Sequence, residues 1–209
     1  MKDVYIAGED EATRAVIERL IKDYAKGLNI LGYIPARGSQ VKASIPNYNQ
    51  LAKTYPVVLL TDLDDDPCAP IGKQVLLNGI TKSRDFIVNF AVDEVEAWLM
   101  ADLKGFAHYF GIPESSMPVS KPQKMSGHKA LPELDVPLKS SWFFTHQLIH
   151  QSTNAERKAQ VAVSPTDKNI KGKEYNLAVV PFIRDHWNPE VARLASDSLN
   201  RMIQRLHAL

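Results

Sequence analysis

Apolar residues along the first half of the chain alternate between the spacing of a strand and that of a helix. Four apolar runs have the length of strands: residues 4–7, 30–34, 57–61 and 85–92. Helical spacing is found from Ala12 to Tyr24, and a second helix is expected from about Ala69 to Asn78. This alternation predicts an α/β fold whose mostly parallel sheet is covered by helices on both faces.

The second half of the chain is mainly helical in pattern. A helix is expected from Glu94 to Leu103, and its pattern continues to Phe110 before a stop at Gly111-Ile112-Pro113. Two stretches rich in Pro and polar residues are expected to be a long surface loop and a loop or small insertion, respectively: residues 35–49 and 114–136. We therefore predict an α/β core over residues 1–112, with a Pro-rich loop and a helical extension packed on it over residues 113–209.

Carboxylates follow three of the four strand-like runs. They are Glu9, Asp10 and Glu11 after the first run, Asp62 and Asp64 after the third, and Asp93, Glu94 and Glu96 after the fourth. Because side chains alternate along a strand, Asp62 and Asp64 should leave the same face. Carboxylates that converge from several strand ends suit Mg²⁺-dependent phosphoryl chemistry. The alternative is that acids in a first helical turn only stabilise the helix, and that Glu96 only forms a surface pair.

These motifs resemble a known family. Gly8 with its acids, the following helix, and a strand ending in Asp62-Leu63-Asp64 resemble the Toprim domain of topoisomerases, primases and overcoming-lysogenization-defect nucleases. Three further segments are similar to small Toprim-like proteins that are often encoded beside an ATPase in bacterial defence loci: residues 93–102, 171–176 and 196–199.

The resemblance implies a Toprim-like fold and a nuclease that depends on Mg²⁺ or Mn²⁺, acts on DNA or RNA, and works with an ATPase partner in anti-phage defence. Asp62 and Asp64 would bind the metal, and Glu94 or Glu96 would supply the remaining carboxylate.

One residue departs from the Toprim pattern. The first strand of a Toprim domain ends in Glu-Gly, whereas Ala7 precedes Gly8 here. Glu9 or Glu11 could take the acid/base part instead. Alternatively, the protein is a scaffold that kept the fold, lost catalysis, and binds a partner protein or nucleic acid. A hydrolase of small phosphoesters is a third hypothesis.

The overall charge gives no general attraction to nucleic acid, since 25 Lys and Arg balance 24 Asp and Glu. Any such contact must come from a local patch, for which Lys121, Lys124 and Lys129 in the Pro-rich stretch are the candidates. The single cysteine, Cys68, excludes an internal disulfide and favours the cytoplasm. No apolar stretch is long enough for a membrane span, so no membrane partner is expected.

Overall fold

The computed structural model describes residues 2–34, 39–63, 66, 68–123, 131–136, 139–164 and 166–209; the side chains of residues 39, 42, 121–123 and 131 are also outside the description. The chain forms two compact units, residues 1–92 with 201–209 and residues 93–200, and each is considered by itself. The boundary expected at residue 112 lies inside the second unit. No helix among the described residues is both long and apolar enough to cross a membrane.

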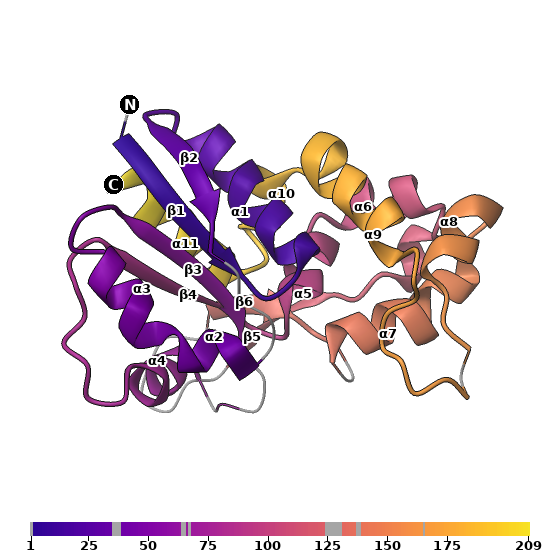
Figure 1. The fold of residues 1–209 in the computed structure, drawn as a ribbon. Coiled ribbons are helices and arrows are strands. Elements are labelled where there is room, and N and C mark those ends of the chain that lie inside the picture. Colours follow the sequence, from indigo (N-terminus) through magenta and orange to yellow (C-terminus); the bar gives the residue numbers. More distant parts are fainter. Residues whose placement is uncertain are drawn as a thin grey trace. The chain divides into compact units, whose positions relative to one another are not determined.

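The first unit is built on a four-stranded parallel sheet. Its strands are β1 (Lys2–Gly8), β2 (Leu28–Tyr33), β3 (Val57–Asp62) and β4 (Phe86–Ala91). Their order is β2-β1-β3-β4, and every neighbouring pair is parallel, which confirms the predicted α/β class and all four strands (Figure 1). Since Gly8 pairs with Leu60 and Asp62 with Ala91, three strands end at the same edge of the sheet.

Helices cover both faces of this sheet. One face carries α1 (Glu11–Tyr24) and the end of α11 (Asp197–His207), whose Tyr24 and His207 rings lie 5.5 Å apart. The other face carries α2 (Ser39–Ala43), α3 (Ile45–Leu51) and α4 (Ala69–Leu77), which pack on β3 and β4 (Figure 1).

The surface loop expected over residues 35–49 is wrong where the structure describes it, because α2 and α3 lie there. Val41, Ile45 and Tyr48 are buried and form a stripe at helical spacing against β3 and β4. Pro46 hides this stripe in the sequence, because a proline among polar residues is typical of a loop. It lies in the first turn of α3, where a missing N–H costs no hydrogen bond.

The second unit is mainly helical, as predicted for the C-terminal part. Its helices are α5 (Val95–Met100), α6 (Leu103–Phe110), α7 (Ser140–His146), α8 (Ala155–Val161), α9 (Tyr175–Pro181) and α10 (Pro189–Ala192), and a π-helical turn follows α9 over Phe182–His186. The expected loop or insertion between residues 114 and 136 contains a hairpin of β5 (Ser120–Gln123) and β6 (Leu131–Leu134). Packed aromatic rings form the core: Phe106, Phe110, Phe144 and Phe182.

A buried carboxylate fixes the start of α11. Glu133 of β6 is 5% exposed and accepts hydrogen bonds from the Ser198 N–H (2.7 Å) and the Ser196 hydroxyl (2.8 Å). Burial raises the pKa of Glu133 to about 7, against the opposing effect of these hydrogen bonds. The folded protein therefore holds this proton more tightly than the unfolded chain does.

We expect this carboxyl group to make the folded protein less stable as the pH rises, because its folded pKa lies above its unfolded value. The free energy of unfolding should fall by about 3 kcal/mol between about pH 4 and about pH 8 on account of Glu133 alone. Glu133→Gln, which keeps an acceptor for the Ser198 N–H, should remove this part of the pH dependence in denaturant titrations. The exposed Glu114→Gln is the control, and an equal slope in both variants would contradict the assignment.

Candidate functional site

Glu9 lies beside the end of β3. β1 ends at Gly8, where a Cβ atom would come within 3.0 Å of the Thr13 side chain, so the chain passes very close to α1. The Thr61 hydroxyl, on the neighbouring strand, donates a hydrogen bond to the Glu9 carboxylate. Because Thr61 is buried and immediately precedes Asp62, this bond holds Glu9 at the carboxyl end of the sheet.

Asp62 is the last residue of β3 and is half-buried. Asp64, its predicted partner in metal binding, lies outside the described residues. Within the part of the chain that is described, no three or more His, Cys, Asp or Glu side chains are grouped so that they could hold a metal ion. The first unit thus brings Glu9 to the end of the strand that carries Asp62.

The two acids after Glu9 belong to the start of α1. Asp10 is its N-cap, and its carboxylate accepts hydrogen bonds from the Thr13 N–H (2.8 Å) and hydroxyl (2.7 Å). This confirms the helix-terminal alternative for Asp10. Glu11 is exposed in the first turn, where a carboxylate also interacts favourably with the helix dipole. Of these two glutamates, the structure therefore places Glu9 at the end of β3 and Glu11 on the exposed surface of α1.

In the second unit, Asp93 and Glu94 form a turn with left-handed backbone, with φ of 58° and 76°. The Ser140 hydroxyl donates to the Asp93 carbonyl, and the Ser141 N–H donates to the Glu94 carboxylate at 2.7 Å. Burial of its carboxyl group, and then the nearby Asp135 carboxylate, raise the pKa of Asp93, although the residue as a whole is exposed. Glu94 therefore anchors the first turn of α7.

Glu96 is a buried residue, and the surface pair considered for it is wrong. It is 2% exposed, and its carboxylate accepts hydrogen bonds from the Tyr175 hydroxyl (2.7 Å) and the Lys171 ammonium (2.8 Å). A charge withdrawn from water needs such partners. These contacts give Glu96 a structural part that requires no metal.

Residues 93–102, 171–176 and 196–199 contact one another in the second unit. Glu96 binds Lys171 and Tyr175, and the Trp98 indole donates to the Ser198 hydroxyl at 2.8 Å. Segments 171–176 and 196–199 thus each supply a hydrogen-bond partner to a buried side chain of segment 93–102.

Lys121, Lys124 and Lys129 are the lysines predicted to bind nucleic acid. Lys121 is part of β5, but its side chain lies outside the description, and Lys124 and Lys129 lie outside the described residues altogether. Their role stays a prediction.

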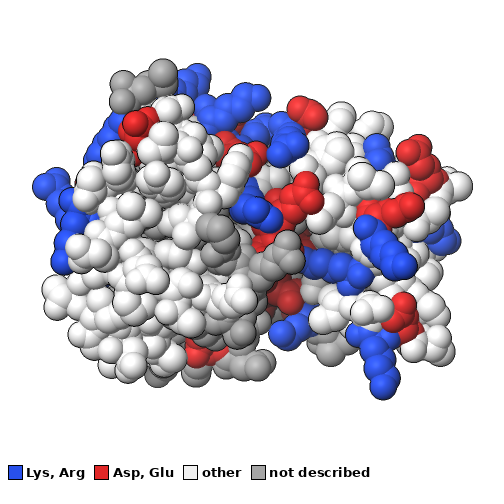
Figure 2. Space-filling view, viewed as in Figure 1, with Lys and Arg blue, Asp and Glu red and all other residues white. Residues whose placement is uncertain are grey.

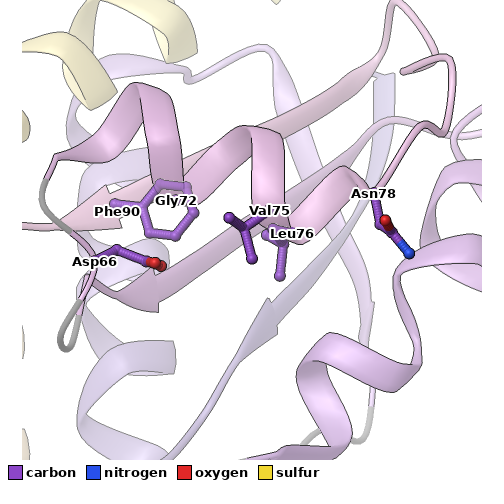
Figure 3. A pocket seen from close by; sticks show the side chains of 6 residues that line it. All are labelled: Asp66, Gly72, Val75, Leu76, Asn78 and Phe90. Atoms are coloured by element: carbon purple, nitrogen blue, oxygen red, sulfur yellow. The ribbon is translucent and has the colours of Figure 1, made fainter.

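A cavity of about 370 Å³ lies in the first unit between α4 and the end of β4. It is lined by Asp66, Gly72, Val75, Leu76, Asn78 and Phe90 (Figure 3). A Cβ atom on Gly72 would come within 3.0 Å of the Asp66 carboxylate, so the glycine lets α4 approach the chain at Asp66. The lining has one carboxylate, from Asp66, and one amide, from Asn78, and its other residues are apolar or glycine. The surface over α3 and α4 also carries few charged side chains (Figure 2).

Thr61 is the residue of this site that the sequence reading missed. Its signal was available, because a hydroxyl side chain interrupts an otherwise apolar run directly before the acids. A buried hydroxyl at that position needs an acceptor, and Glu9 supplies it.

We expect Lys171→Met to destabilise the fold by about 1–3 kcal/mol, because it leaves the Glu96 carboxylate buried with one partner. Adding Glu96→Gln should restore part of this loss, since it removes the uncompensated charge. Chemical denaturation measures both, with the exposed Lys168→Met as control. Equal stability of Lys171→Met and the wild type would show that the pair does not support the fold.

A family model described as a domain of unknown function (DUF4276) matches residues 7–207. Neither a curated protein nor a solved structure gives a significant match to the chain.

Proposed function

We propose that this chain, which belongs to the DUF4276 family, is a metal-dependent nuclease or a related phosphodiester-cleaving enzyme. The observation that carries the proposal is the hydrogen bond from Thr61 to Glu9. It supports the proposal because it places a carboxylate at the end of β3, next to Asp62, although the first strand carries Ala7 where the Toprim pattern has Glu.

In this proposal Asp62 and Asp64 bind Mg²⁺ or Mn²⁺, for which carboxylate oxygens are suitable ligands. The metal, when bound, stabilises charge on the scissile phosphate and lowers the pKa of an attacking water. Glu9 is the acid/base residue, held in place by the Thr61 hydroxyl. The Toprim resemblance extends the proposal to a DNA or RNA substrate, an ATPase partner and a part in cytoplasmic anti-phage defence.

We expect the purified protein to cleave DNA or RNA with Mg²⁺ or Mn²⁺, and the double variant Asp62→Ala, Asp64→Ala to lose this activity. Gel electrophoresis of labelled single- and double-stranded substrates measures it. The double variant Asp167→Ala, Asp185→Ala removes two exposed carboxylates and is the matched control. Equal cleavage by the wild type and the Asp62, Asp64 variant would remove the proposed site.

Thr61→Val should weaken cleavage about 10- to 100-fold, the range seen when the groups that orient a metal or catalytic residue are removed. Valine keeps the shape of this buried side chain, so the fold should be retained. Thr61→Ser keeps the hydroxyl and should remain close to wild type. A loss shared equally by both variants would point to packing instead of to the bond with Glu9.

A second function, a non-catalytic Toprim-like scaffold, is favoured by two observations. Ala7 replaces the expected acid, and the Glu96 carboxylate is already bound to Lys171 and Tyr175. Calorimetric titration with Mg²⁺ and Mn²⁺ separates the two functions. Metal binding that depends on Asp62 and Asp64 supports the enzyme, and its absence supports the scaffold, which would bind a partner protein or nucleic acid.

A further inference from the structure

β4 is an outer strand of the sheet, and the carbonyl groups on its outer edge accept no hydrogen bond from another strand among the described residues. The carbonyls of Asp85 and Ala91 accept hydrogen bonds from the β3 side, each at 3.0 Å. Because successive carbonyls of a strand point to opposite sides, those of Phe86 and Val88 face the outer edge. Two cationic side chains donate to them.

Lys82 is the first of these cations. Its ammonium donates to the carbonyls of Ser83 and Phe86, both at 2.7 Å. The loop that carries it is fixed by the Asn49 side chain, which donates to the Thr81 carbonyl (3.0 Å) and accepts from the Ser83 N–H (2.7 Å). An ammonium has three N–H donors, so two are used by these carbonyls and the charge is held at the sheet edge.

Arg205 is the second cation and comes from α11, within the same unit. Its guanidinium donates to the Asn89 side chain at 2.7 Å and, more weakly, to the Val88 carbonyl at 3.4 Å. Asn89 is 1% exposed, whereas Arg205 is exposed. A buried amide thus orients a charge that water and ligands can reach.

Lys73 of α4 completes the group, and its charge interacts unfavourably with those of Lys82 and Arg205. Burial lowers the pKa of Lys73 and of Lys82, and the neighbouring cations lower both further. Asp85 is the opposing charge near Lys82, but its carboxylate also pairs with Lys2 at 3.3 Å. Three cations from three elements therefore lie close enough to repel one another, and Asp85 opposes part of this effect at Lys82.

We propose that Lys73, Lys82 and Arg205 form a binding site for a phosphate group. An oxyanion relieves the repulsion among them and accepts charge-assisted hydrogen bonds, and a guanidinium suits phosphate particularly well. The phosphate is assigned to the backbone of a nucleic acid; this assignment, unlike the site, rests on the proposed function. Such a contact positions a strand without reading its sequence.

The test measures binding in EDTA, so that it does not depend on cleavage. Fluorescence anisotropy follows a labelled single-stranded oligonucleotide, and calorimetry follows inorganic phosphate. Lys73→Gln, Arg205→Gln should weaken oligonucleotide binding several-fold and reduce the slope of log affinity against log salt by about 1.4. The matched control, Lys22→Gln, Lys26→Gln, removes two exposed charges at the end of α1, which are not part of the proposed site, and should bind as the wild type does.

Lys73→Gln alone should change the stability of the fold and the affinity for phosphate in opposite directions. Without any anion it should raise the melting temperature, because it removes a repelling charge, while it weakens phosphate binding. Loss of binding to both ligands in the Lys73, Arg205 variant supports the site on a nucleic-acid backbone. Loss of phosphate binding alone supports the site for a free phosphate. No binding by the wild type, or equal binding by this variant and the control, would overturn the proposal.

Discussion

The parallel pairing of β3 between β1 and β4 is the constraint on which the first unit depends. Val57 to Leu60 are fully buried, so the strand is covered on both faces, as parallel strands must be. A slip of one residue would turn every side chain to the opposite face, and the two different helical layers would no longer fit. The register is thereby fixed, and with it the place where Thr61 meets Glu9 and where Asp62 ends its strand.

The same sheet has an outer strand that needs protection. An unpaired strand edge is a template for association with other chains. Here Lys82 and Arg205 donate to the carbonyls of Phe86 and Val88, so side-chain cations occupy positions that another strand would take. Protecting the edge and gathering positive charge are therefore one arrangement. Burial lowers the pKa of Lys73 and Lys82, and the repulsion among these cations lowers both further.

The sequence predicted what depends on local pattern. Apolar runs located the four strands, and acids after them located the carboxyl edge. The sequence did not predict features that depend on contacts between residues far apart in the chain. Residues 39–49 are mainly helical although their Pro and polar residues predict a loop. Glu96, a candidate metal ligand with a surface pair as the alternative, is instead buried against Lys171, which is 75 positions away in the chain. The hydrogen bond from Thr61 to Glu9 also joins residues 52 positions apart, which no local spacing reveals.

The register also bears on what Glu9 can do in place of an acid at position 7. Ala7 pairs with Leu59 and Gly8 with Leu60, so continuing the register puts Glu9 opposite Thr61. Two residues along a strand restore the same face, displaced by about 6.6 Å. Thr61 and Asp62 are consecutive, and their side chains leave β3 on opposite faces. Glu9 is therefore held to the face that Asp62 does not use, so in the proposed function it would not share a metal with Asp62 and would have to reach the phosphate past the end of β3.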